Sequence, residues 1–276
     1  MEKIKSALAY LESIKKEVKK SELIFLFLDY DGTLTEIRSR PAEAIPGKDL
    51  IGLLNGLLDS RFIITIISGR SLDDLKKMIK EIKLKGINLV GSHGSEIQLA
   101  NSESIIETDQ GNQLEEKQAV DAVKKLVIPR ARKIKNILIE EKPISLAIHY
   151  RNIPEEESIK IEELVDYIDG LKKRYDFRYM ALKKLIEIMP SYLNKGMAIK
   201  KITDSSKNRD LKKGKNLVIC IGDDVTDEDL FLANKSGVNI KVKHSPGQAP
   251  DSLDTEADYY LGDPGEVIYF LKNIIN

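Results

Sequence analysis

The stretch FLFLDYDGTL, residues 25–34, decides the fold. An apolar run that begins at Ile24 stops at two carboxylates, Asp29 and Asp31, and the glycine and threonine of a tight turn follow. A strand that is apolar at consecutive positions is buried on both faces, which is typical of a parallel sheet covered by helices. In such sheets ligands bind outside the carboxyl ends of the strands. The stretch therefore predicts a central strand with a functional site at its tip.

Two other apolar runs end in the same way. Phe62 to Ile67 is followed by Ser68-Gly69-Arg70, and Leu217 to Ile221 is followed by Gly222-Asp223-Asp224. Helical patterns alternate with these runs, as at residues 72–82. The alternation predicts an α/β fold with a parallel sheet, and we expect the three polar clusters to converge on one crevice.

The middle of the chain has a different order of elements. Its patterns predict a helix, two strands, a second helix and two more strands, at residues 113–127, 137–140, 145–150, 155–174, 177–181 and 185–189. This αββαββ order predicts a small α+β unit inserted into the parallel-sheet domain. We expect a core of residues 1–99 and 192–276, and an inserted unit of residues 100–191.

Composition and charge exclude several classes of function. The chain has 276 residues, 42% of them hydrophobic, and its 44 basic and 44 acidic side chains cancel. Such a balance gives no net field for nucleic acid or for an anionic membrane, so we expect neither as a partner. The single cysteine, Cys220, lies in an apolar run and is expected in the core. No apolar segment has the length of a membrane span and the first residues lack a signal-peptide pattern, so we expect a cytoplasmic protein.

Residues 1–20 have the pattern of an amphipathic helix. One apolar stripe at helical spacing is formed by Ile4, Leu8, Leu11, Ile14 and Val18. We expect this helix to dock on the body of the protein, and a partner or oligomer surface is the alternative.

The residues at the strand ends suit phosphoryl transfer. Aspartate is a covalent nucleophile in that chemistry, and a second carboxylate two residues later is placed to protonate the leaving oxygen and then to activate water. A carboxylate and phosphate oxygens repel one another, so the site needs a cation. The acidic stretch GDDVTDED, residues 222–229, offers the oxygen ligands that suit Mg²⁺, with Asp223 as the predicted ligand.

Other interpretations of these acids exist. A D-x-D-G segment is often only a turn, because aspartate turns and caps readily. We expect the acids at positions 227–229 to act mainly at a helix start, with Thr226 as its N-cap.

Two further residues complete a predicted phosphate site. Ser68 has a hydroxyl and a neighbouring glycine N–H at its strand end, and both suit a phosphate oxygen. Lys195 precedes the helical pattern of residues 197–202, so its charge and the helix-terminal N–H groups are expected to act together on an anion.

These segments resemble the four motifs of the haloacid dehalogenase superfamily of phosphatases, and more closely the trehalose-6-phosphate phosphatases. The matching sequences are DYDGTL, SGR, GSHGSE, EEKPISLAIHYRN, LIEIMP, NKG and GDDVTDED, in this order between Phe25 and about Phe270. The resemblance implies a haloacid-dehalogenase-like Rossmannoid core with the αββαββ insertion as a cap. It also implies Mg²⁺ as cofactor and a sugar phosphate as substrate.

The resemblance assigns catalytic and metal-binding roles. It implies that Asp29 is the nucleophile and Asp31 the acid and base. It further implies that both bind the metal together with Asp223, Asp31 through its backbone carbonyl. Asp224 is expected in a supporting position, where it holds Lys195 or a water of the metal.

The same resemblance implies that Ser68, Gly69 and Lys195 bind the phosphate. The residues expected to contact the rest of the substrate are Arg70, Glu140, Lys142, Arg151, Asn152, Lys183 and Glu187. Charged and amide groups suit this task, because each sugar hydroxyl is both a donor and an acceptor and a polar site rejects ligands that leave its groups unpaired. The alternative for any one of them is an exposed charge on a small sheet.

The sequence thus predicts a Mg²⁺-dependent phosphatase that hydrolyses trehalose 6-phosphate through an aspartyl-phosphate. The alternatives are a sucrose-phosphate or glycosyl-phosphoglycerate phosphatase, and a non-catalytic module that binds a sugar phosphate. We expect a monomer, and the resemblance implies association with a trehalose-phosphate synthase as a further option.

Overall fold

The structure is a computed structural model that describes residues 4–38, 40–58, 60–82, 85–107, 113–142, 144–182, 184–207, 215–243 and 255–275. The chain divides into two units. The first comprises Met1–Thr108 and Asn194–Asn276, and the second, Asp109–Leu193, is inserted between these two segments.

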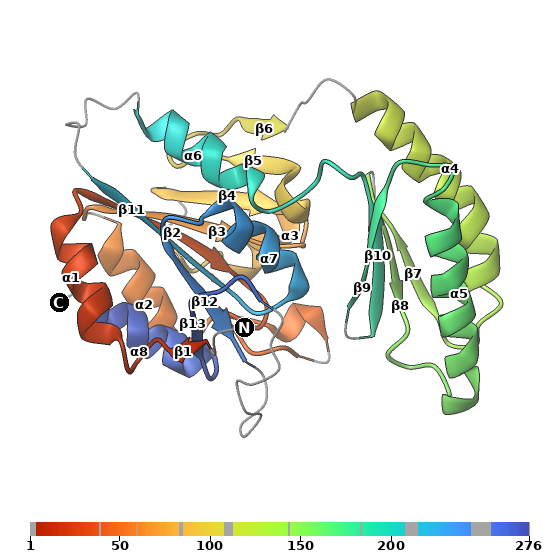
Figure 1. The fold of residues 1–276 in the computed structure, drawn as a ribbon, viewed down its shortest axis with the longest axis horizontal. Helices are drawn as coiled ribbons and strands as arrows, with labels where there is room; N and C mark the ends of the chain where they lie inside the picture. The colour runs from red at the N-terminus through yellow and green to blue at the C-terminus, as the bar shows by residue number, and fades with distance from the viewer. Residues whose placement is uncertain are drawn as a thin grey trace. The chain divides into compact units, whose positions relative to one another are not determined.

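The first unit is built on a nine-stranded sheet (Figure 1). Its strands are β1 (Lys5–Ser6), β2 (Leu23–Asp29), β3 (Phe62–Ile67), β4 (Ile87–Gly91), β5 (Glu96–Gln98), β6 (Ile105–Glu107), β11 (Asn216–Gly222), β12 (Val238–Val242) and β13 (Tyr259–Leu261). They lie in the order β1-β13-β12-β11-β2-β3-β4-β5-β6. Neighbours from β1 to β4 in this order are parallel, whereas β4, β5 and β6 pair antiparallel. The expected parallel sheet is confirmed.

Helices cover both faces of this sheet. They are α1 (Leu11–Lys20), α2 (Lys48–Leu57), α3 (Leu72–Met78), α6 (Met197–Lys207), α7 (Glu228–Ala233) and α8 (Pro264–Ile275), with the 3₁₀ turns η1 (Pro41–Glu43), η2 (Ser92–Gly94) and η4 (Val225–Asp227). Ile24, Leu26 and Leu28 of β2 pack with α1, α2, α3 and α8, whereas Phe25 and Phe27 pack with α6 and α7. Successive residues of a strand point to opposite faces, and in β2 both faces are buried. This is why the strand is apolar at every position before Asp29.

The amino-terminal segment differs from the helix expected over residues 1–20. Lys5 and Ser6 instead pair in parallel with β13, and α1 begins only at Leu11. Ile14 and Val18 of α1 are buried in the core of the first unit, so the expected docking of this helix is confirmed. The apolar stripe did not reveal the pairing, because a two-residue strand depends on the sheet edge beside it rather than on its own sequence.

The second unit has its own core. A four-stranded antiparallel sheet, in the order β7-β8-β10-β9, consists of β7 (Leu138–Glu141), β8 (Leu146–His149), β10 (Leu185–Met189) and β9 (Arg178–Leu182). The helical elements are α4 (Gln113–Ala131), η3 (Glu155–Glu157) and α5 (Ser158–Leu171). Apolar residues of α4 and α5 pack with Ile148, Ile186 and Ile188, so both helices cover the same face of the sheet. The predicted αββαββ order is confirmed.

The division between the units falls later in the chain than residue 99. Strand β6 pairs with β5 of the large sheet, and residues 100–108 therefore belong to the first unit. The second unit extends to Leu193, two residues beyond the expected end.

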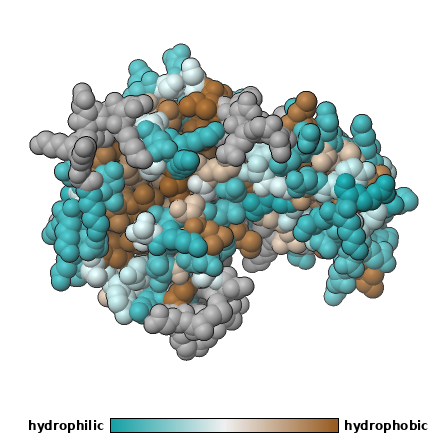
Figure 2. Space-filling view, turned by 45° about the horizontal axis from the view of Figure 1, so that its top comes forward, coloured by the Kyte–Doolittle hydropathy of each residue, from teal (hydrophilic) through white to brown (hydrophobic). Residues whose placement is uncertain are grey.

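The surface is mostly hydrophilic on the face drawn in Figure 2, with several apolar areas between the hydrophilic ones. Exposed large apolar side chains belong to many separate elements, among them Tyr10, Ile45, Leu138, Ile159 and Tyr269. In the part of the chain that the structure describes, every helix is too short or too polar to cross a bilayer.

Candidate active site

The large sheet brings three of the predicted clusters to one edge. Strands β11, β2 and β3 are adjacent and parallel, so their carboxyl ends share that edge. Asp29, the last residue of β2, is in register with Ile67, and Ser68 follows directly. Gly222 ends β11 on the other side of β2, and Asp223 follows. The convergence predicted from the sequence is therefore observed for these three clusters.

The turn after Asp29 is fixed from within. Gly32 has a φ of 91°, in the left-handed region that favours glycine, and its N–H donates to the carbonyl of Thr35 at 2.7 Å. The side chain of Tyr30 is fully buried and its hydroxyl donates to the carbonyl of Ala44 at 2.6 Å. Thr33, also buried, donates from Oγ1 to Oδ1 of Asp223 at 3.2 Å. The turn thus orients a carboxylate of the neighbouring strand, a contact that sequence reasoning missed.

Lys195 lies between two buried carboxylates. Its Nζ donates to Oδ1 of Asp29 at 2.6 Å and to Oδ1 of Asp227 at 2.7 Å. Burial alone lowers the pKa of Lys195, but the carboxylates of Asp227 and Asp29 raise it above its usual value. The ammonium is therefore charged, and α6 begins two residues later, at Met197, whose N–H donates to Oδ1 of Asn194.

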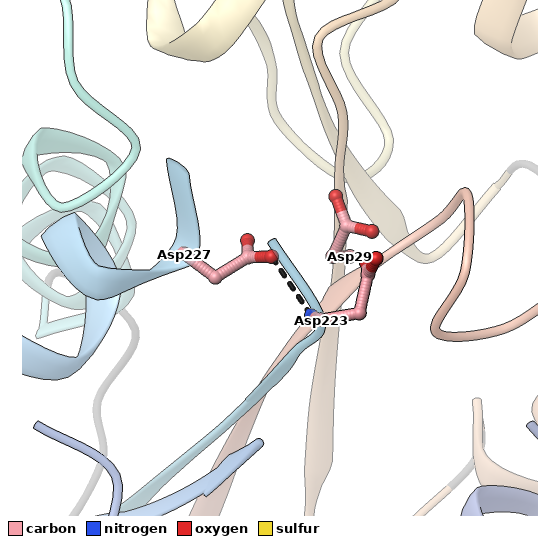
Figure 3. Close-up of side chains that lie close together, drawn as sticks. All are labelled: Asp29, Asp223 and Asp227. Carbon is pink, nitrogen blue, oxygen red and sulfur yellow. Dashed lines mark hydrogen bonds between the residues drawn. The ribbon is translucent and has the colours of Figure 1, made fainter. Parts of the chain in front are cut away.

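Asp227 is fully buried and holds this arrangement together. Its Oδ2 accepts from the backbone N–H of Asp223 at 2.9 Å (Figure 3). The same oxygen accepts from the N–H of Asp224 at 3.0 Å, and Oδ1 accepts from Lys195 at 2.7 Å. A side chain on Gly222 would collide with the Asp227 carboxyl group, so glycine is required there. Sequence reasoning treated Asp227 as a helix-start acid and missed this role.

Two predictions near η4 need correction. The expected contact to Lys195 comes from Asp227, whereas Oδ1 of Asp224 accepts from the N–H of Val225 at 2.6 Å. Asp224 is the N-cap of η4 and forms a capping box with Asp227. Asp227, rather than Thr226, is the N-cap of α7. The pattern of two acids three residues apart was the available signal. A role of Asp224 in holding a metal-bound water stays a prediction.

Three carboxylates lie close enough to share a cation. Asp29, Asp223 and Asp227 each offer an oxygen within 4.8 Å of the others. Burial raises the pKa of Asp29 well above its usual range, and the charges of Asp227 and Asp223 add to the effect while Lys195 opposes it. Burial and the charges of Asp227 and Asp224 likewise raise the pKa of Asp223 to about 7.

Both raised pKa values show that the ionised forms of these two buried acids are disfavoured. A bound cation would favour the charged form of both acids. Hard oxygen ligands of this kind fit a divalent cation. Both carboxylate oxygens of Asp227 accept hydrogen bonds, and the carboxylates of Asp29 and Asp223 point toward each other in Figure 3. Asp29 and Asp223 are therefore the better ligands of the three.

The side chain of Arg70 forms an ion pair with Asp31. Its Nε donates to Oδ2 and its Nη2 to Oδ1 of Asp31, both at 2.6 Å. This is the bidentate geometry in which arginine fixes the plane of a carboxylate. The side chain of Asp31 remains 35% exposed, so solvent or a ligand still reaches it. The sequence placed Arg70 with the substrate, and its observed partner is the predicted acid.

The segment that contains Ser68 is supported by the GSHGSE turn, residues 91–96. Ser68 is buried, and its Oγ accepts from the N–H of Arg70 at 3.1 Å. The N–H groups of Ser92 and His93 donate to the carbonyls of Arg70 and Ser68. The His93 ring fills the space where a side chain at Gly69 would lie. Gly69 therefore allows the two turns to approach closely.

In the second unit, polar residues gather on the sheet face opposite to α4 and α5. Glu140, Ala147, Glu187 and Met180 are direct neighbours across the four strands and so point to the same face. Glu187 is buried, and its Oε1 accepts from Nζ of Lys142 at 3.2 Å.

Glu140 is the second acid on this face of the sheet. Its Oε2 lies 3.3 Å from Nε2 of His149, and this hydrogen bond lowers the pKa of Glu140. Small Ala147 separates the two glutamates, so the face carries two acids with a gap between them.

The other second-unit residues predicted to contact the substrate are Arg151, Asn152 and Lys183. Arg151 and Asn152 are exposed in the turn that follows β8. Lys183 lies outside the described residues. The structure therefore brings Glu140, Lys142 and Glu187 together, and Arg151 and Asn152 follow in the turn after β8.

A parallel sheet with an aspartate pair at the tip of its central strand, a buried lysine and an acidic turn after the adjacent strand define a haloacid-dehalogenase-like α/β fold. Comparison with known proteins gives the family. The chain belongs to the trehalose-phosphatase family, whose sequence profile matches residues 27–264.

Individual relatives agree with this assignment. The chain is 32% identical to probable trehalose-phosphate phosphatase 3 of Oryza sativa subsp. japonica, over all of this chain and 75% of that protein. It is 31% identical to a trehalose-phosphatase of Schizosaccharomyces pombe over 94% of this chain, and there it spans 31% of the longer protein. The solved C-terminal domain of Candida albicans trehalose-6-phosphate phosphatase superimposes with a TM-score of 0.82 at 25% identity, with 98% of each chain covered.

Proposed function

We propose that this chain is a Mg²⁺-dependent phosphatase that hydrolyses trehalose 6-phosphate to trehalose and phosphate. The observation that carries the proposal is the position of Asp29, a buried carboxylate at the tip of a central strand whose Oδ1 is held by Lys195 at 2.6 Å. The family and the names of its relatives support the substrate.

Asp29 acts as the nucleophile in this proposal. A carboxylate oxygen of Asp29 forms a bond to phosphorus while the bond from phosphorus to the sugar oxygen breaks. Lys195 holds Asp29 in place and offers its charge to the phosphate oxygens, together with Ser68 and the N–H of Gly69. Asp31 donates a proton to the departing sugar oxygen.

The second step reverses the use of Asp31. Asp31 takes a proton from water, the water oxygen bonds to phosphorus, and the bond from phosphorus to Asp29 breaks to release phosphate. Both oxygens of Asp31 accept from Arg70 in the structure. Each oxygen keeps a second lone pair, so proton transfer uses the lone pair that Arg70 does not occupy.

The acidic cluster is proposed to hold Mg²⁺ through Asp29, Asp223 and the carbonyl of Asp31. When bound, the cation neutralises the repulsion between the phosphate and the carboxylates. Thr33 and Asp227 keep Asp223 in place. Thr33 donates to the Asp223 carboxylate, and the Asp227 carboxylate accepts from the backbone N–H of Asp223.

The second unit is proposed to recognise the sugar. Glu187, Lys142 and Glu140 present charged groups on one face of its sheet, and Arg151 and Asn152 follow from the adjacent turn. Because Glu187 is buried, any hydrogen-bonding group left unpaired beside it is costly. A substrate whose hydroxyl fits this position therefore binds more tightly than one that leaves a polar group without a partner.

A panel of phosphate esters tests the proposal. Purified protein is incubated with Mg²⁺ and trehalose 6-phosphate, sucrose 6-phosphate, a glycosyl phosphoglycerate, glucose 6-phosphate or p-nitrophenyl phosphate, and released phosphate is measured. We expect the highest kcat/KM for trehalose 6-phosphate, loss of activity with EDTA and recovery with Mg²⁺. Preference for another sugar phosphate would change the substrate, and absence of hydrolysis of every ester would favour a non-catalytic binding module.

Association with a trehalose-phosphate synthase, a monomeric state and a cytoplasmic location remain predictions. Size-exclusion chromatography with light scattering tests the monomer. The same measurement on a mixture with a purified synthase tests the association.

A further inference from the structure

Lys241 is an unusual residue for its position. It belongs to β12, which lies between β11 and β13 and is buried along its whole length. Interior strands of a parallel sheet are normally apolar on both faces. The side chain of Lys241 is only 9% exposed, and a buried ammonium is tolerated when it is paired and hydrogen-bonded.

Its two hydrogen-bond partners explain why the charge is kept. Nζ of Lys241 donates to the backbone carbonyl of Asp224 at 2.8 Å and to Oε1 of Glu228 at 2.9 Å. The same Asp224 carbonyl accepts from the N–H of Asp227 at 3.1 Å. Lys241 therefore fixes the first peptide group of the turn that carries Asp227.

This turn positions the candidate active site. Asp227 is oriented by the N–H groups of Asp223 and Asp224, and it holds Lys195, which in turn holds Asp29. The Asp224 carbonyl belongs to the peptide that joins Asp224 to Val225, so rotation of this peptide would break its bond from the Asp227 N–H and free Asp227 to move. Lys241 thus acts on the cluster through the backbone, without touching Asp29 or Lys195.

Glu228 fixes the lysine from the other side. Its Oε1 also accepts from Oγ1 of Thr255 at 2.9 Å, and its Oε2 accepts from the N–H of Glu256 at 2.8 Å. The carboxylate is therefore anchored to the segment that leads into β13. An anchored carboxylate gives the ammonium of Lys241 a single position.

We propose that Lys241, oriented by Glu228, is a positioning residue for the metal and phosphate cluster of this chain. It holds the Asp224 carbonyl and thereby the N–H of Asp227, and through the Asp227 carboxylate it positions Lys195 and the backbone N–H of Asp223. The inference deepens the proposed function and rests on it where hydrolysis is the measurement. Mg²⁺ binding provides a second measurement that does not depend on turnover.

The experiment compares wild-type protein with Lys241→Met, Lys241→Arg and the control Lys235→Met. Lys235 is exposed in the turn between α7 and β12, so its variant removes an equal charge nearby without changing η4. In Lys241→Met we expect kcat to fall about ten-fold to hundred-fold for trehalose 6-phosphate and p-nitrophenyl phosphate alike, with little change in KM. Calorimetry should show Mg²⁺ binding weakened by about ten-fold or more. Lys241→Arg should recover part of both losses, and Lys235→Met should match wild type.

Each outcome decides the inference. If folded Lys241→Met keeps kcat and Mg²⁺ affinity within about two-fold of wild type, Lys241 is a structural residue only and the proposal is wrong. If Lys241→Met does not fold, Glu228→Gln takes its place, because it keeps the shape and one acceptor oxygen but removes the negative charge that pairs with Lys241. Unchanged kcat and Mg²⁺ affinity in folded Glu228→Gln would equally overturn the proposal.

The test also separates this inference from the proposed substrate. If wild-type protein hydrolyses only the aryl phosphate, the trehalose assignment fails and the comparison of variants continues on that ester. If it hydrolyses no ester, Mg²⁺ calorimetry on wild type, Lys241→Met and Lys235→Met decides whether Lys241 positions the cluster.

Discussion

The two units hold their charged residues in different ways. In the first unit the functional groups lie on turns at the ends of strands, and opposite charges or backbone N–H groups fix them, as Lys195 fixes Asp29. In the second unit Glu140 and Glu187 lie within strands, where the pairing register sets their common face. A shift of one residue in register would turn such a side chain to the other face. The proposed catalytic residues are therefore positioned by turns at the edge of the large sheet. The proposed sugar-binding residues are positioned by the alternation of side chains along strands.

The largest expected effect falls on the first unit. Asp29→Asn replaces the nucleophile by an amide of nearly the same shape, and we expect kcat to fall at least about 10³-fold for both the sugar phosphate and p-nitrophenyl phosphate. Steady-state phosphate release by repurified, folded protein is the measurement. Substantial turnover of either ester by this variant would rule out the covalent role.

Substitutions in the second unit should affect hydrolysis of the sugar phosphate only. Glu187→Ala is expected to lower kcat/KM for trehalose 6-phosphate by about ten-fold to a thousand-fold, which corresponds to about 1.4 to 4 kcal/mol of lost transition-state interaction. Hydrolysis of p-nitrophenyl phosphate, which has no sugar, should change little. Parallel loss of both activities would mean that Glu187 acts on the fold or on the phosphate.

Controls for this variant use the same sheet. Glu141→Ala removes an exposed glutamate of β7 and should leave both activities unchanged. Because removing Glu187 leaves Lys142 without its carboxylate, Glu187→Gln is measured beside it, and the melting temperature of each variant is recorded.

A substitution of Arg70 tests whether this residue orients the acid Asp31 or binds the sugar. Its bidentate contact with Asp31 predicts that Arg70→Met lowers kcat for both substrates, by about ten-fold to hundred-fold, because the acid loses its orientation. The assignment of Arg70 to the sugar predicts instead a loss for trehalose 6-phosphate alone. Lys77→Met, at an exposed position of α3, is the control. The ratio of the two activities decides between these roles.

The smallest effect concerns stability and pH. The pKa of Asp223 is about 7 in the folded protein against a usual 3.8, so the folded state holds the proton more tightly than the unfolded chain. Without metal, this acid therefore favours folding at low pH, and the contribution is lost as pH rises from about 4 to about 7. Mg²⁺ needs the ionised acid, so the rise in melting temperature on adding Mg²⁺ should be a few degrees larger at about pH 8 than at about pH 6. Thermal-shift titration measures it, and equal rises at both values would contradict the assignment of Asp223 as ligand.

Much of the fold followed from apolar patterning. The runs before Asp29, Ser68 and Asp223 became β2, β3 and β11, because interior parallel strands are apolar throughout. The pattern failed for β12, which contains the buried polar residues Asn239 and Lys241. Their partners, such as Asn234 for Asn239, are visible only after folding. Short strands β5 and β6 were missed because three residues carry too little periodicity.

The sequence identified candidate residues that directly follow a strand or precede a helix. It missed roles that depend on which side chains lie close together in the folded protein. Nothing in the sequence distinguishes Asp227 from Asp224 as the partner of Lys195. The choice is made by Gly222, whose missing side chain gives room to the Asp227 carboxyl group. Arg70 was assigned to the substrate by the family resemblance. Its contact with Asp31 depends on the pairing of β2 with β3, which the sequence does not show.

The position of β2 between β3 and β11 also has a consequence for folding. β3 follows β2 within about forty residues, but β11 arrives only after the whole second unit has been made. Closing so long a loop costs entropy before any contact repays it, and pairing of distant segments slows folding. Until residues 216–222 are available, β2 exposes one edge of an almost wholly apolar strand, a template for pairing with other chains. A chain truncated before residue 216 should therefore aggregate rather than form a smaller sheet.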